Sequence, residues 1–166
     1  MKKNALMILF CCMISAIFVG CGNQAAAQAQ TSQTTMIGNP WSDWDSIEEA
    51  ESVIGFSFGL PEVIADSYTA VSIRTLNDEL IEVVYRNEAD EVCIRKQKGE
   101  GQDISGDYNE YETCTEVNRD GGIMTDYRNS NDPAVKQLIS YKGYSWSLVA
   151  PNGCSDWDLA RELWEQ

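Results

Sequence analysis

Asp103, Ser105 and Asp107 place side-chain oxygens at alternate positions of one polar segment, and Glu110 follows three residues later. Carboxylate and hydroxyl oxygens are the ligands that calcium takes in proteins. The spacing differs from that of an EF-hand loop, which has glycine at its sixth position and glutamate at its twelfth. Short polar side chains also bond their own backbone in ordinary turns. The segment is therefore either a calcium loop or, as we favour, a solvated loop without metal.

Cys21 follows a stretch that has the layout of an export signal. Two lysines lie near the start, residues 5–19 are almost wholly apolar, and Gly20 is the small residue before the expected cut. A cysteine directly after such a cut resembles the lipobox of bacterial lipoproteins, in which the thiol carries a diacylglycerol. We predict a signal peptide over residues 1–20 and lipidation of Cys21.

The alternative for residues 5–20 is an uncleaved membrane anchor. A spanning helix needs roughly 17–25 apolar residues, so this run is at or below the required length. It is followed by Gly-Cys-Gly-Asn instead of a basic cluster. These features favour the cleaved signal, and both interpretations place the rest of the chain at the outer face of the cell membrane.

Three of the six cysteines, Cys93, Cys114 and Cys154, lie beyond the signal and the lipidation site. A disulfide is permitted outside the cytoplasm. We predict Cys93–Cys114 as the first choice of pair, because these residues fall in consecutive predicted strands. The alternative is three small buried thiols. A metal site built from cysteines alone is disfavoured, because the sequence has no Cys-x-x-Cys spacing.

Composition narrows the function classes. The chain has no histidine, which excludes histidine-based catalytic triads and histidine-ligated zinc. Two of its 12 basic residues lie in the signal, so 10 basic and 26 acidic residues would remain after cleavage. Such an acidic chain lacks the basic footprint that nucleic acid requires, and an anionic membrane surface would repel it. We expect no cofactor and no catalytic residues.

The remaining sequence divides into a tether and a domain. Residues 21–37 consist of the lipidated cysteine and a stalk rich in Gln, Ala, Ser and Thr, without an apolar period. Residues 38–166 have the length of a single domain. Helical spacing of apolar residues after a capping residue, Asp45 or Ser46, predicts a short helix over about 46–54, and similar spacing predicts another over about 155–165.

Between these helices, apolar and polar residues alternate in the manner of strands that have one buried face. Turn signals separate them, among them Asp120-Gly121 and Lys142-Gly143. We predict an α+β fold with about seven antiparallel strands in a meander-like sheet and both helices on one face. The predicted strands cover residues 69–75, 80–85, 92–95, 111–117, 123–127, 135–141 and 144–149.

Several segments between residues 38 and 164 together resemble a known family. These are Gly38-Asn39-Pro40-Trp41, Gly55-Phe56, Leu60-Pro61, Ile81-Glu82-Val83-Val84-Tyr85, Glu91-Val92-Cys93-Ile94-Arg95-Lys96 and Asp103-Ile104-Ser105-Gly106-Asp107-Tyr108-Asn109. The family is the domain of unknown function 4367, which occurs in lipoproteins and membrane proteins of Gram-positive gut anaerobes. The resemblance implies a non-catalytic α+β module, found in some members on the outer side of anti-sigma-type regulators. It supplies no ligand and no catalytic residues.

These observations together predict a cell-surface lipoprotein with a non-catalytic binding or sensing module, linked to membrane signalling. Its expected partners are the membrane, through the lipid on Cys21, and an extracytoplasmic protein. One alternative is a carrier lipoprotein, with a curled sheet offering a groove to an apolar or lipidic ligand. A second alternative is a carboxylate-dependent hydrolase, because the chain has many acidic residues.

Overall fold

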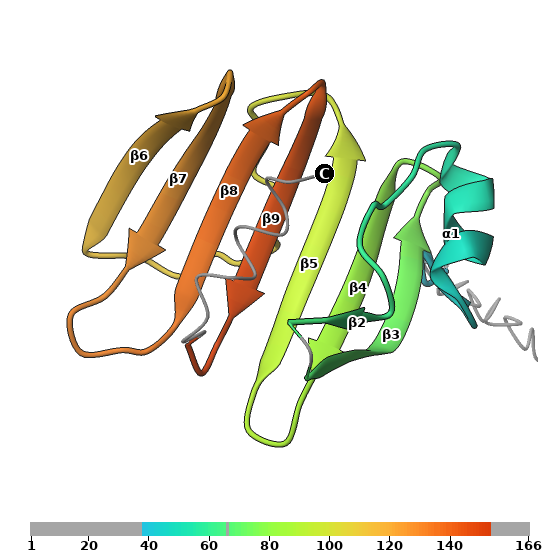
Figure 1. Cartoon of the computed structure of the whole chain (residues 1–166), viewed down its shortest axis with the longest axis horizontal. Helices are drawn as coiled ribbons and strands as arrows, with labels where there is room; N and C mark the ends of the chain where they lie inside the picture. Colours follow the sequence, from blue (N-terminus) through green and yellow to red (C-terminus); the bar gives the residue numbers. More distant parts are fainter. Residues whose placement is uncertain (1–37, 66, 154–166) are drawn as a thin grey trace, which may run out of the picture. The chain divides into compact units, whose positions relative to one another are not determined.

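The computed structural model describes residues 38–65 and 67–153, which all belong to the second of the two units of the chain, Ile37–Gln166. Its elements are β1 (Trp41–Trp44), α1 (Ile47–Ile54), β2 (Val63–Ile64), β3 (Tyr68–Leu76), β4 (Leu80–Arg86), β5 (Glu91–Lys98), β6 (Thr113–Arg119), β7 (Gly122–Arg128), β8 (Val135–Tyr141) and β9 (Tyr144–Ala150). Antiparallel pairing joins the strands into one sheet of order β1-β3-β4-β5-β9-β8-β7-β6, with β2 also paired to β3 (Figure 1). No helix in this part of the chain has the length and apolar character needed to cross a membrane.

The predicted α+β class with an antiparallel sheet is confirmed, but its details differ. The seven predicted strands correspond to β3–β9, whereas β1 and β2 were missed. Both missed strands are short, with four and two residues, so alternation had too few positions to reveal them. The first predicted helix is α1, and the second, at 155–165, lies outside the described residues.

The sheet is made of two meanders instead of one. β3, β4 and β5 pair in chain order, and so do β6, β7, β8 and β9. The chain segment 99–112 crosses from β5 to β6, and β9 then pairs with β5 along Cys93–Lys98. The predicted single meander is therefore wrong at this junction, because the long connection separates β5 from its sequence neighbour β6.

Local sequence signals define α1 and the hairpins. The side chain of Ser46 accepts a hydrogen bond from Glu49 N at 3.2 Å, and Gly55 ends the helix with a left-handed φ of 68°. The Asp120-Gly121 turn has φ values of 49° and 83°. Two consecutive positive φ angles identify a type I′ turn, whose twist matches that of the flanking strands. Lys142-Gly143 repeats this geometry, so both predicted hairpins are confirmed.

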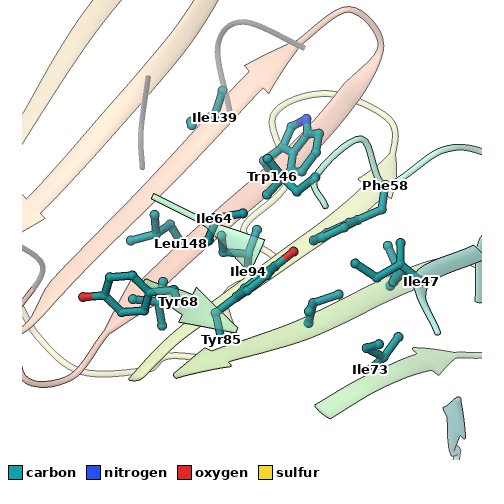
Figure 2. Close-up of a cluster of buried hydrophobic side chains, with 14 of the residues drawn as sticks. Ile47, Phe58, Ile64, Tyr68, Ile73, Tyr85, Ile94, Ile139, Trp146 and Leu148 are labelled. Carbon is teal, nitrogen blue, oxygen red and sulfur yellow. The ribbon is translucent and has the colours of Figure 1, made fainter. Parts of the chain in front are cut away.

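The hydrophobic core lies on one face of the sheet, which we call the helix face because α1 and residues 56–64 pack on it. Phe58, Tyr85, Ile94, Trp146 and Leu148 are all at most 3% exposed. Figure 2 shows Phe58 beside Trp146, and their ring centroids are 5.6 Å apart. We call the opposite face the loop face, because residues 99–111 pack on it.

Candidate binding surface

The segment 99–111 is anchored across the loop face by hydrogen bonds to β9 and its hairpin. Gly99 N donates to Gly143 O at 2.8 Å, and Gln102 N donates to the Ser145 hydroxyl at 3.0 Å. The same hydroxyl donates to Gly99 O at 2.8 Å. These bonds hold the first residues of the segment against the sheet, and the carboxylate of Asp103 then lies within reach of Lys136 on β8.

Lys136, on β8, organises those carboxylates. Its ammonium lies 3.1 Å from Asp103 Oδ2 and donates to Asp107 O at 3.4 Å. Ser105 completes the cluster, because its backbone N–H and its hydroxyl both donate to Asp103 Oδ1. Lys136 is only 6% exposed, so its charge would be costly without these oxygen partners.

Two tyrosines border the Lys136 cluster. The ammonium lies 4.6 Å from the ring centroid of Tyr127 and 5.5 Å from that of Tyr111, within the range of cation–π attraction. The Tyr111 hydroxyl donates to the Asp107 carboxylate. Lys136 and Tyr127 are directly opposite each other on β8 and β7. The cluster therefore combines residues from two strands and one loop.

The pKa values in the cluster reflect these contacts. Burial would raise the pKa of Asp103, but the hydrogen bonds from Ser105 and the neighbouring Lys136 outweigh it and lower that pKa below its ordinary value. Burial and the adjacent Asp107 carboxylate raise the pKa of Tyr111 well above its ordinary value. Tyr111 therefore stays a hydrogen-bond donor across the physiological range.

The structure separates the four residues of the predicted calcium loop. Asp103, Ser105 and Asp107 come together, but around the Lys136 ammonium. Glu110 is exposed and lines a different hollow, next to Tyr111. Within the described residues, no group of three or more acidic, cysteine or histidine side chains could hold a metal ion. Of the side-chain oxygens that suggested calcium, the Asp103 carboxylate has the Lys136 ammonium as its partner, whereas those of Ser105 and Asp107 bond other groups of the loop.

A groove of about 380 Å³ adjoins the cluster on the loop face. Strands β6 to β8 form its floor, and loop residues 101–103 form its wall. Its lining combines apolar and aromatic side chains with carboxylates and hydroxyls. The lining residues are Gly101, Gln102, Asp103, Glu116, Ile123, Thr125, Tyr127, Leu138, Ile139 and Ser140.

A second charge cluster lies at the other end of the loop face. Glu82, on β4, is 1% exposed and pairs with both Arg74 and Arg95. The Arg95 guanidinium also donates to Ile104 O at 2.9 Å, which ties this cluster to the loop. Trp41 covers it, with its ring centroid 4.3 Å from the Arg74 guanidinium carbon. All charges here are paired within the protein, so we assign this cluster to structure.

Lys96 occupies the opposite, helix face of the sheet. Its ammonium lies 4.3 Å from the Trp146 ring centroid and 4.5 Å from that of Tyr144, and it donates to Ser57 O and Phe58 O. Burial lowers the pKa of Lys96 to about 8. The side chain fastens the chain after α1 to the sheet and has no opening toward the groove.

The predicted Cys93–Cys114 disulfide is wrong, because both cysteines are free. Strands β9, β8 and β7 lie between β5 and β6. Four strand spacings amount to about 19 Å, whereas a disulfide requires Cα atoms within roughly 7 Å. Burial raises the pKa of Cys93 to about 12. Cys21 and Cys154 lie outside the described residues.

Sequence reasoning missed Lys136, Tyr127 and Glu82. The sequence did contain a sign that two of them are buried, because Lys136 and Glu82 each lie beside apolar residues in a predicted strand. A charge inside such a strand indicates a partner, but the partner belongs to a distant segment.

Comparison of the chain with family models, with curated proteins and with solved structures gave no match. The fold and the groove together define an antiparallel α+β domain with a candidate binding surface. The resemblance to the domain of unknown function 4367 stays a prediction.

Proposed function

We propose that this protein is a cell-surface lipoprotein whose α+β domain is a non-catalytic binding or sensing module for an extracytoplasmic protein, linked to membrane signalling. The groove on the loop face supports this most directly, because it exposes Ile123 beside carboxylate and hydroxyl groups. The loop that forms its wall is held by the buried Lys136 cluster, so the surface is preorganised, which lowers the entropic cost of binding. Export and the tether at Cys21 would present this surface outside the cell.

The other functions have less support. A carrier of an apolar ligand would need a mainly apolar cavity, whereas Asp103 and Glu116 line the groove. A carboxylate-dependent hydrolase would need two acidic groups available to a substrate. On the loop face, the buried Glu82 and the groove residue Asp103 are already paired with arginine and lysine, respectively.

Site-specific photo-crosslinking on intact cells tests the binding function. The crosslinker replaces Ile123 in the groove, or Val71 as a control, which is a similarly exposed β-branched residue on the distant strand β3. We expect a discrete protein adduct from position 123 and none from position 71. Equal adducts from both positions, or none from either, would reject the groove as a binding surface.

Mass spectrometry of the membrane-extracted chain tests the tether. We expect the mature chain to start at Cys21 and to carry the mass of a diacylglycerol. An intact, unmodified N-terminus would reject the lipoprotein assignment and leave the binding surface to be judged by crosslinking.

A further inference from the structure

β6 forms one edge of the sheet in the described part of the chain and lacks most of the features that usually protect such an edge. Within the described residues it pairs only with β7, and all seven of its residues are exposed. Every residue from Thr113 to Arg119 has a partner on β7, so the strand is regular, and it contains neither proline nor lysine. The strand at the opposite edge, β1, has four residues. Short edges, proline, charged side chains (lysine above all) and bulges are the usual means of preventing strand addition, and of these β6 has only the charged Glu116 and Arg119.

The hairpin turn decides which backbone groups of β6 point away from the sheet. Residues flanking a two-residue turn form a hydrogen-bonded pair, here Arg119 and Gly122. Bonded and non-bonded pairs alternate along an antiparallel ladder. Cys114, Glu116 and Asn118 therefore direct their N–H and C=O groups toward the open edge, where they can pair with another strand.

The same three residues place their side chains on the loop face. Glu116 and Asn118 are opposite Thr125 and Ile123 on β7, which form the groove floor together with Glu116 itself. The groove thus adjoins the open backbone edge. A strand added to β6 would carry every second side chain on the groove side, next to the Glu116 carboxylate.

Charge indicates what kind of segment fits there. The whole chain has a net charge of −14, and the groove lining contains two carboxylates and no basic residue. A second copy of the chain would bring an equal negative charge to the edge. A lysine or arginine directly opposite Glu116 would instead form a favourable cross-strand pair.

We propose that β6 binds an extended segment of a partner protein as an additional strand, and that the segment carries a lysine or arginine opposite Glu116. This inference rests on the proposed binding function and names its mode. In such strand addition, hydrogen bonds between the backbones of β6 and the partner segment supply affinity, and the alternate side chains of the segment supply specificity.

Peptide binding to the full chain in detergent tests the proposal. The probe is the capped peptide Thr-Val-Thr-Lys-Thr-Val-Thr, and its matched control has glutamate in place of lysine. We expect the lysine peptide to bind more tightly, and binding to protect the amides of Cys114, Glu116 and Asn118 from hydrogen exchange. Failure of the lysine peptide to bind, or protection elsewhere, would overturn the proposal.

Three substitutions separate backbone pairing from charge. Asn118→Pro removes an N–H group that points to the open edge and makes no hydrogen bond to β7, so the sheet itself keeps all its bonds. We expect this variant to weaken peptide binding on the order of tenfold or more. Glu116→Gln should weaken binding of the lysine peptide about threefold and remove the preference over the glutamate peptide. Val117→Thr, whose side chain is on the helix face, should leave binding unchanged.

The remaining outcomes are also decisive. Concentration-dependent dimerisation that Asn118→Pro abolishes would show that a second copy occupies the edge, and would overturn the choice of partner. If the peptide binds but hydrogen exchange of the β6 amides is unchanged, strand addition as the mode of binding is overturned. If crosslinking from position 123 captures a protein on cells and Asn118→Pro does not affect it, the binding function stands and strand addition is rejected.

Discussion

Arg95 and Glu82 are opposite each other on β5 and β4, and Arg95 Nε donates to Glu82 Oε2 at 2.6 Å. Arg74, from β3, pairs with the other carboxylate oxygen. Three adjacent strands are thus joined through one carboxylate that is 1% exposed. A buried charge with two hydrogen-bonded partners is stable only while all members are present.

We therefore expect Glu82→Ala to lower the free energy of unfolding by about 3–5 kcal/mol, because it leaves two guanidinium groups without their partner. Urea denaturation measures this change. Glu91→Ala is the matched control, since Glu91 pairs with Arg86 across the same two strands but at an exposed position. That control should cost at most about 1 kcal/mol, and equal losses would contradict the role of burial.

The lowered pKa of Lys96, about 8 against an ordinary value of 10.5, makes stability depend on pH. Between these values the unfolded chain binds more protons than the folded one, so the free energy of unfolding rises with pH. Relative to Lys96→Met, the wild-type chain should gain about 1 kcal/mol between pH 7.5 and 9. Denaturation at both pH values measures the difference, and a gain of the same size in both proteins would rule out Lys96 as its source.

The two described cysteines should react at very different rates. Cys114 is exposed on β6, whereas burial raises the pKa of Cys93 to about 12 from an ordinary value of 9.0. At neutral pH, Cys93 should form roughly 1000-fold less thiolate than an ordinary thiol. Timed alkylation followed by peptide mapping should label Cys114 within minutes and spare Cys93 until urea unfolds the chain. Similar rates in the folded protein would be inconsistent with this structure.

Removal of the Lys136 ammonium should loosen the loop that forms the groove wall. Lys136→Met leaves Asp103 and the Asp107 carbonyl without a cationic partner, and we expect a loss of about 1–3 kcal/mol in the free energy of unfolding. Hydrogen exchange at the Ser105 and Asp107 amides should also accelerate. Lys142→Met, at an exposed hairpin turn, should change stability by no more than about 0.5 kcal/mol. If the loop amides exchange equally fast in both variants, Lys136 does not hold the loop.

Much of the secondary structure was predictable because its signals are local. Alternation revealed β3–β9, the serine cap and Gly55 delimited α1, and glycine positions revealed two hairpin turns. The order of the strands was not predictable in this way. Alternation reports which side chains share a face, but not whether β5 has β6 or β9 as its neighbour.

The candidate site shows the same division. The polarity of residues 103–110 suggested cation ligands, and the structure supplied the cation as Lys136, 33 residues from Asp103. The groove was missed, because its floor and wall come from three strands and one loop that are separate in sequence. Cys93 and Cys114 were paired for their closeness along the chain, although three strands lie between them.

The sequence by itself determined the antiparallel strands, the two hairpin turns and the acidic charge, because each depends on neighbouring residues or on composition alone. The tertiary structure decided that β9 pairs with β5, that Lys136 meets Asp103 and that β6 is left at an edge. These outcomes depend on the path of the segment 99–112 over the loop face. That path is set by contacts of the segment with Arg95, Lys136 and Ser145, which are distant in sequence, and no local pattern encodes them.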